Sequence, residues 1–303
     1  MPSRFVETFG LSALEGVTAG CPLIAPASGG LAQFVQAGFT IPAGDTRLSP
    51  QELIECETKN FLDLVSCIVQ EFSLEKWTLE SKVARSIGAK YKPENWYTTV
   101  QSSIGARVLL VTDYSAPLGG IESFVRFVGR TLGANGHEVD VITSTTGKHK
   151  ILRYLGLIFT VFNVVFAVRL ALRIQRYKPD AIWLHSVLRA IGPVGLLPLL
   201  WYPGRVLITY HDLGYFVPYP RRIERESQIG DQSWARFRAD IEGPHSAIAI
   251  TLKYLSLLCM RVILRRVDTH LIPSEFLREP VARILGLNRV STIELHSHVN
   301  PHL

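Results

Sequence analysis

One segment near the middle of the chain limits the possible folds more than any other. Residues 107–112 read RVLLVT, an unbroken apolar run typical of a strand buried on both faces of a parallel sheet. After the loop at 113–120, apolar side chains recur at helical spacing, at Ile121, Phe124, Val125, Val128 and Leu132. Gly136 closes this helix, and residues 138–143 (EVDVIT) supply a second strand. Such a strand–helix–strand unit predicts a parallel sheet with right-handed crossovers.

The same alternation continues toward the end of the chain. We expect strands at 181–185, 205–211 and 269–273, and helices at 151–176 and 246–266. The sequence therefore predicts an α/β fold of Rossmann-like domains, in which residues 105–303 form one doubly wound parallel-sheet domain. Ligands of such a sheet bind beyond the carboxyl ends of its strands. Those ends carry Asp113, Thr143, His185 and His211.

Residues 1–104 differ from the rest in charge. They contain 8 Lys and Arg against 11 Asp and Glu, a net charge of −3, whereas residues 105–303 contain 24 against 15, a net charge of +9. Within residues 1–104, helices are expected at 51–72, 74–91 and 94–103. We therefore predict a partial domain in residues 1–104 and a second domain in residues 105–303.

Composition and cysteine spacing exclude several classes of protein. The chain is globular, because 47% of its residues are hydrophobic and only 19% are charged. Its first residues, MPSRFVETFG, lack the basic start and apolar run of a signal peptide, so we do not expect secretion. Its longest uncharged stretches, 154–168 and 190–204, fall short of the roughly 20 residues that span a bilayer. No nucleic-acid-binding motif occurs. The spacing of the cysteines fits neither CxxC pairs nor a set of metal ligands, which favours a reducing cytoplasmic setting. The four cysteines are Cys21, Cys56, Cys67 and Cys259.

The segment 2–38 carries the most specific chemical pattern. Glu7 and Glu15 stand eight positions apart, and Phe9 and Gly10 open a helix between them. The first turn of a helix presents unpaired N–H groups and a positive dipole end, which suit a diphosphate, and a carboxylate accepts paired hydrogen bonds from vicinal hydroxyls. The alternative is that both glutamates are solvated charges of a helix.

This segment resembles the E-x7-E segment of retaining glycosyltransferases of family 4, which have the GT-B fold. The resemblance implies that Glu7 binds hydroxyls of the donor sugar at the reacting centre. It implies that the backbone of Phe9 and Gly10 approaches the sugar and phosphate, and that Glu15 binds the ribose.

Residues 107–143 are similar to the first strand–helix–strand unit of the amino-terminal domain in the same family. There the paired glycines, here Gly119 and Gly120, let the backbone approach the donor phosphate and the acceptor. The alternative is that the glycines only allow a tight turn. A nicotinamide-dependent oxidoreductase is the rival for such a unit, but it requires G-x-G-x-x-G and an acidic residue after the second strand. The sequence has neither.

Three strand-end residues are further candidates. In the family, a histidine at the place of His211 reaches the donor sugar or the reacting centre, so His211 is a catalytic candidate beside Glu7. His185 and Asp113 are candidates for the acceptor side. Structural roles are the alternatives: strand-end histidines are often structural, and the Asp113 side chain could cap its turn.

The resemblance implies a hexosyltransferase-type enzyme that transfers a sugar, with retention, from a nucleotide-sugar to an acceptor, either lipid-linked or a polysaccharide. It implies no metal and no other cofactor. The domain order is reversed, however, and the early strands of the donor domain do not occur. We therefore expect a fused, truncated or, less readily, permuted chain, in which a second chain completes the donor domain. The alternative function is a non-catalytic module that binds a sugar nucleotide or an acceptor.

Two expected helices combine apolar and basic residues. Arg169, Arg173 and Arg176 lie near the end of the helix at 151–176, and the helix at 246–266 carries Lys253, Arg261, Arg265 and Arg266. Such helices pack on a core with cationic ends, or they attach to an anionic membrane surface. The second possibility predicts a peripheral position at the inner membrane face.

Overall fold

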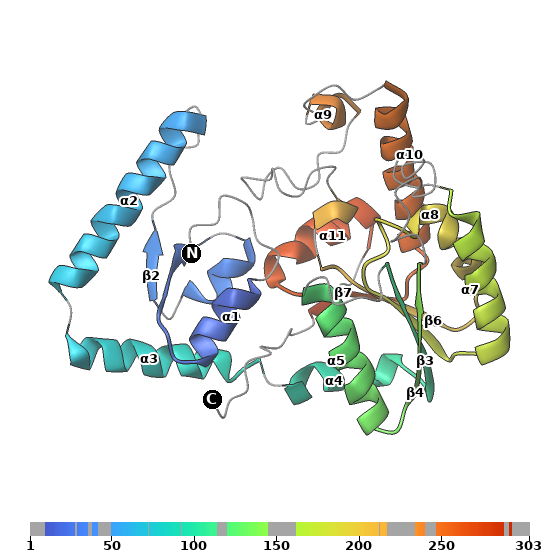
Figure 1. Ribbon diagram of the computed structural model, residues 1–303, viewed down its shortest axis with the longest axis horizontal. Coiled ribbons are helices and arrows are strands. Elements are labelled where there is room, and N and C mark those ends of the chain that lie inside the picture. Colours follow the sequence, from blue (N-terminus) through green and yellow to red (C-terminus); the bar gives the residue numbers. More distant parts are fainter. Residues whose placement is uncertain are drawn as a thin grey trace.

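The computed structural model describes residues 10–27, 29–35, 38–41, 50–71, 73–91, 93–113, 120–144, 162–211, 213–216, 234–239, 247–287 and 291–292. A parallel sheet flanked by helices dominates the fold, and a smaller region with two strands lies beside it (Figure 1). The predicted α/β, Rossmann-like fold is confirmed. No helix in the described ranges is long and apolar enough to cross a bilayer.

The main sheet has six parallel strands in the order β4-β3-β5-β6-β7-β8. Their bounds are β3 Arg107–Thr112, β4 Glu138–Thr143, β5 Ala181–Leu184, β6 Arg205–Thr209, β7 Thr269–Ile272 and β8 Ser291–Thr292. The strands β5 and β6 end one and two residues earlier than the sequence pattern predicts. This difference places His185 and His211 in the loops that follow them.

Alternate residues of β3, β5, β6 and β7 enter two separate cores. Leu109 and Val111 of β3 pack under the helices α7 (Val164–Tyr177), α10 (Ala247–Leu264) and α11 (Arg278–Leu285), which cover one face. Val108 and Leu110 pack on the opposite face, under α5 (Gly120–Ala134). Figure 1 shows α5 and α7 on opposite sides of the sheet. The sheet is thus buried on both faces, as the apolar run of β3 predicts.

The first region contains α1 (Leu11–Thr18), β1 (Leu23–Pro26), η1 (Gly29–Gln33), β2 (Gly38–Ile41), α2 (Pro50–Gln70) and α3 (Leu74–Gly88). The strands β1 and β2 pair in parallel and form a separate two-stranded sheet. Helix α1 packs tightly on α3. Gly88 at the end of α3 allows this close approach, since a Cβ atom there would lie only 2.6 Å from Cα of Thr18 in α1. Among the described residues, this region therefore consists mainly of helices, packed beside a sheet of two short strands.

Helix α4 (Pro93–Val100) joins the two regions. Its Trp96 is fully buried, with its ring 5.9 Å from that of Trp183 in β5 and 6.0 Å from that of Phe127 in α5. The next residue, Tyr97, has its hydroxyl 2.8 Å from Nε2 of His137, just before β4. An element that precedes residue 104 thus packs on the sheet that follows it. The domain boundary at residue 104 stays a prediction.

Candidate functional site

Two histidines meet at the carboxyl edge of the main sheet. His185 follows β5 and His211 lies two residues after β6, and these neighbouring strands are in register, with Leu184 opposite Ile208. Nδ1 of His185 and Nε2 of His211 are therefore only 3.2 Å apart. His185 is fully buried, whereas His211 is half-buried. The sheet brings together two of the candidate residues that the sequence indicates.

An aromatic cage surrounds this histidine pair. The His185 ring stacks on Trp183, with ring centroids 5.1 Å apart. The Phe124 ring of α5 makes T-shaped contacts with both histidines, with ring centroids 5.9 Å from His185 and 5.2 Å from His211. Trp183 is held in place by its indole N–H, which donates to the hydroxyl of Thr209 at 2.9 Å. Trp183 was not among the residues predicted for the site, although two-residue strand periodicity places it on the same face as His185.

Desolvation in this cage keeps both imidazoles neutral. It lowers the pKa of His211 from 6.5 to about 3 and lowers the pKa of His185 well below 6.5, to which the nearby His211 contributes. In a neutral pair, one of the two facing nitrogens donates its proton and the other accepts. The far nitrogen of His185, Nε2, is buried with no hydrogen-bond partner. The pair is suited to hydrogen bonding and poorly suited to taking up a proton at neutral pH.

Asp113, directly after β3, is fully buried and holds the neighbouring loop. Its Oδ1 accepts hydrogen bonds from the backbone N–H groups of Ala190 and Ile191, both at 3.0 Å. Its Oδ2 accepts from the N–H of Arg189 at 2.8 Å and from the hydroxyl of Ser186 at 3.2 Å. Burial raises the pKa of this carboxyl to about 6, against the lowering effect of these donors. The geometry favours the capping role for Asp113 over contact with an acceptor.

The Tyr215 hydroxyl fixes the backbone next to the histidine pair. Its buried hydroxyl donates to the carbonyl oxygen of His185 at 2.9 Å and accepts from the N–H of Val187 at 3.2 Å. The loop after β6 is thereby fastened to the loop after β5. No local pattern in the sequence marks this tyrosine, because its role depends on a contact between residues 30 positions apart.

The donor-side candidates lie mainly in the first region. Gly10 has φ 86° and directly precedes α1, where a Cβ atom would lie 2.5 Å from Cδ2 of Leu31. Only glycine therefore fits this position without a shift, and the predicted start of the helix is confirmed. Glu15 is half-buried within α1. Within the described residues, its side chain makes no hydrogen bond or ion pair with His185 or His211. Glu7, Phe9 and Gly119 lie outside the described residues.

Two connections link these candidates to the main sheet. The η1 segment, which contains Leu31, contacts η9 (Glu275–Leu277) just after β7. Gly120 begins α5, one turn before Phe124 in the aromatic cage. The start of α5 and the histidine pair therefore share one edge of the sheet.

Within the described residues, no group of three or more His, Cys, Asp and Glu side chains is arranged to hold a metal ion. A comparison with curated proteins finds no match to the chain. The family model described as Glycosyltransferase Family 4 matches residues 118–295, which is more than half of the 303 residues. This match begins two residues before α5, ends just beyond β8 and includes the histidine pair, Phe124 and Tyr215. The chain belongs to glycosyltransferase family 4.

Proposed function

We propose that this glycosyltransferase transfers a hexose from a nucleotide-sugar to an acceptor hydroxyl with retention, and that His211 lies at the reacting centre. One observation carries the proposal: a neutral, half-buried histidine is fixed at the carboxyl edge of the sheet, within the part of the chain that matches the family. Ligands of doubly wound sheets bind at this edge.

The low pKa of His211 limits what this residue does. Because the pKa is about 3, the imidazole is a weak base at neutral pH and acts as a hydrogen-bond partner of the donor sugar. The bond between the anomeric carbon and the diphosphate oxygen breaks, and a bond to the acceptor oxygen forms on the same face. The acceptor proton leaves with the nucleoside diphosphate. His185 orients His211, and His185 itself is too deeply buried to contact an acceptor in this conformation.

The remaining roles follow the family resemblance. Glu7 binds sugar hydroxyls, the backbone of Phe9 and Gly10 approaches the phosphate, and Glu15 binds the ribose. Gly119 and Gly120 bring the start of α5 toward the leaving diphosphate. Fixed backbone donors at the starts of α1 and α5 stabilise the developing negative charge, so that the step needs no metal or other cofactor.

A binding module without catalysis is the second candidate. It is favoured by the first region, whose described strands form only the two-stranded sheet β1-β2. In this case a second chain completes the donor side. Turnover separates the two candidates, because both bind a sugar nucleotide and only the enzyme consumes it.

The test is binding and hydrolysis of UDP-glucose and GDP-mannose by the purified chain, with calorimetry and release of free sugar as readouts. We expect saturable binding of one of them, loss of binding in Glu7→Ala, and at least tenfold slower hydrolysis in His211→Ala. His137→Ala is the matched control, because this histidine lies at the amino edge of the sheet, with Nδ1 2.8 Å from the Gly105 carbonyl. Unchanged hydrolysis in His211→Ala would overturn the assigned role of His211.

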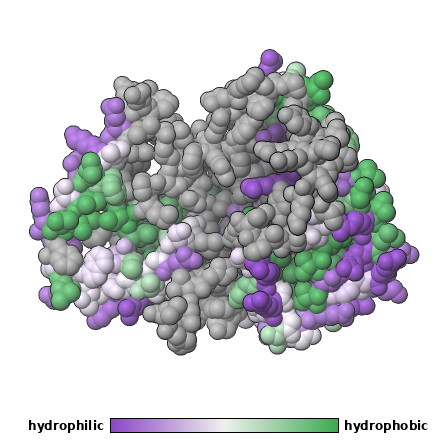
Figure 2. All heavy atoms as spheres, in the orientation of Figure 1, coloured by the Kyte–Doolittle hydropathy of each residue, from purple (hydrophilic) through white to green (hydrophobic). Residues whose placement is uncertain are grey.

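We also propose an anionic membrane surface as a partner, at the cytoplasmic side. The helices α7 and α10 contain no Asp or Glu, and η5 (Leu197–Trp201) contacts both of them. Figure 2 shows hydrophobic and hydrophilic surface side by side on the flank where α7 lies. Exposed apolar side chains from the three elements are Val164, Val165, Val168, Leu172, Leu197, Trp201, Ile248, Leu255 and Val262.

Basic residues occur in the last turns of two of these elements. Arg176 is in the last turn of α7 and Arg261 is in the last turn of α10. Apolar side chains with flanking cations suit the interface of an anionic bilayer. Flotation with vesicles of phosphatidylcholine, with and without phosphatidylglycerol, tests the proposal. We expect binding to the anionic vesicles alone, weakened in Trp201→Ser and retained in the first-region control Trp77→Ser; equal flotation with both vesicle types would refute it.

A further inference from the structure

A cavity of about 360 Å³ lies between α5 and the edge strand β4. Its floor is apolar, formed by Val125 of α5 with Val139 and Val141 of β4. Its polar lining includes Thr112 and Thr143, the last residues of the paired strands β3 and β4. The cavity therefore reaches the carboxyl edge of the sheet, where the histidine pair lies two strands away.

The backbone geometry keeps this cavity open. Gly129 of α5 lines it without a side chain, and a Cβ atom there would lie 3.6 Å from Leu110 and 3.9 Å from Val139, at ordinary contact distance. The strand β4 pairs with β3 alone in the described sheet, so Val141 remains 45% exposed. An alanine would fit at Gly129, whereas a leucine would fill part of the cavity.

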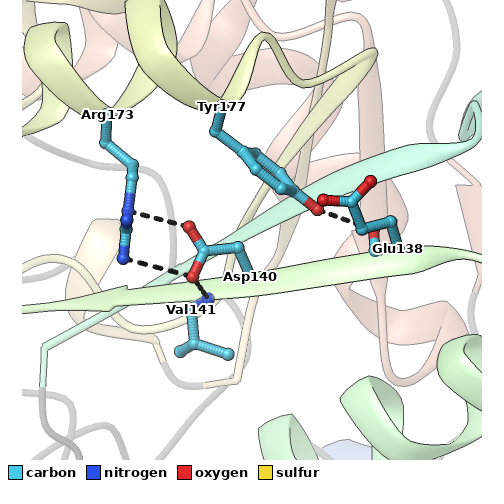
Figure 3. Close-up of polar contacts among 5 residues, drawn as sticks. All are labelled: Glu138, Asp140, Val141, Arg173 and Tyr177. Atoms are coloured by element: carbon cyan, nitrogen blue, oxygen red, sulfur yellow. Dashed lines mark hydrogen bonds and ion pairs between the residues drawn. The ribbon is translucent and has the colours of Figure 1, made fainter.

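The opposite face of β4 is fixed, as Figure 3 shows. Asp140 forms an ion pair with Arg173 of α7, with Nε and Oδ2 2.8 Å apart, and the Tyr177 hydroxyl donates to the Glu138 carbonyl oxygen at 2.8 Å. Because residues alternate along a strand, Val139, Val141 and Thr143 face the other way, toward α5. The strand β4, which lines the cavity, is therefore anchored both to the rest of the sheet and to α7.

The charged lining favours an anion. Arg126 and Arg130 stand four positions apart on the exposed side of α5, and neither makes a hydrogen bond or ion pair with a described residue. Thr112 is 2% exposed, and its hydroxyl is buried without a hydrogen-bond partner. Glu122 is the single acidic residue of the lining, against the two arginines. Guanidinium and hydroxyl donors over an apolar floor match an organic anion with a short apolar part.

We propose that this cavity binds the acceptor, and that the acceptor is an amphiphile whose phosphate or carboxylate group pairs with Arg126 and Arg130 while its apolar part contacts Val125, Val139 and Val141. This inference rests on the proposed transferase function only in calling the ligand an acceptor. The binding site itself rests on the cavity, the two arginines and the buried hydroxyl of Thr112.

The test uses n-octyl phosphate as the probe, below its micelle concentration, with the full chain and calorimetric detection. Inorganic phosphate and octyl glucoside are the comparison ligands. We expect saturable binding of octyl phosphate that is at least tenfold tighter than that of either comparison ligand. If inorganic phosphate bound as tightly as octyl phosphate, the cavity would be a site for free phosphate and the proposal of an amphiphilic ligand would be wrong. Absence of octyl phosphate binding by the folded protein would overturn the site itself.

Four variants locate the binding. The double variant Arg126→Gln and Arg130→Gln is expected to weaken octyl phosphate binding at least tenfold, and the matching double lysine variant is expected to retain most of it. Gly129→Leu is expected to abolish binding, whereas Gly129→Ala is expected to leave it unchanged. Unaltered binding in the double glutamine variant or in Gly129→Leu would refute the location.

Sugar-nucleotide binding is measured in the same samples. If octyl phosphate binds and no sugar nucleotide does, the transferase proposal fails while the anion site stands. If a sugar nucleotide binds and octyl phosphate does not, the cavity proposal fails alone.

Discussion

The two regions of the molecule differ in the sheet around which each is built. The six-stranded sheet is covered on both faces, and its central strands β3, β5 and β6 are buried almost throughout. The first region has a two-stranded sheet, and its α2 and α3 leave large side chains such as Leu62, at 56%, and Leu79, at 62%, exposed. Part of its buried surface also belongs to a core shared with the main sheet. We infer that the main sheet folds independently and that the first region depends on it.

The largest expected effect comes from substitution of Trp183 in the main sheet. Trp183→Ala removes a fully buried indole, its hydrogen bond to Thr209 and its packing on Trp96 of α4. A loss of about 3–5 kcal/mol in unfolding free energy is expected, as for other buried tryptophans. Hydrogen exchange should accelerate in both regions, because α4 carries the contact between them.

Leu14→Ala in α1 is the matched substitution in the first region, since Leu14 is also fully buried. It should cost about 2–5 kcal/mol locally. Faster exchange should be confined to the first region, with the amides of β3 unaffected. Equal acceleration in β3 would show that the two regions unfold as one unit, which would contradict the independent folding of the main sheet.

The sequence predicts the main sheet well because its signals are local. The apolar runs of β3 and β5, the helical spacing of α5 and the position of Gly136 depend only on neighbouring residues. The histidine pair was predictable in part, since both residues follow strands that a doubly wound order makes neighbours. Contacts across the sheet were not predictable in this way. The Tyr215 brace and the bonds from Asp113 to the loop after β5 join residues far apart in sequence, and no local pattern encodes them.

Asp113→Asn is expected to have the next largest effect. An asparagine places an NH₂ group against backbone N–H groups that donate to the carboxylate, which leaves buried donors unpaired. We expect a loss of about 2–3 kcal/mol in urea denaturation. Asp268→Asn is the control, because its half-exposed carboxylate accepts the N–H of Val206 through one oxygen. An effect of Asp113→Asn no larger than that of the control would contradict the capping role.

The pH dependence of stability should originate in the main-sheet region, because every resolved pKa shift among the described residues lies there. The lowered pKa of His211 means that its contribution is present above pH 6.5 and is lost as the pH falls toward about 3. Asp113 acts in the opposite sense. Its raised pKa favours the protonated form in the fold, so its contribution is present below pH 3.8 and is lost as the pH rises through about 6.

Denaturation at pH 6, 5 and 4 measures these contributions as differences between variants. His211→Asn should flatten the acid loss of stability by up to about 1.4 kcal/mol per pH unit, and Asp113→Asn should steepen it by a similar amount. His270, whose pKa burial lowers to about 4, acts in the same sense as His211 and remains in both variants. Identical slopes in wild type and His211→Asn would show that His211 is protonated in the fold.

The smallest expected effect compares one ion pair from each region. Arg173 and Asp140 join α7 to the edge strand β4, and the Asp140 side chain is only 23% exposed. Lys76 and Glu71 join the ends of neighbouring helices at 3.2 Å, and both side chains are largely exposed. We expect Arg173→Ala to cost about 1 kcal/mol and Lys76→Ala less than about 0.5 kcal/mol, because water screens the exposed pair.

Added salt gives the matching control. Raising sodium chloride from 0.05 to 1 M should remove the small effect of Lys76→Ala and leave most of the Arg173→Ala effect, since partly buried pairs are less screened. Equal costs for the two variants would mean that the Arg173–Asp140 ion pair contributes little to the position of β4. Octyl phosphate binding should then survive Arg173→Ala unchanged.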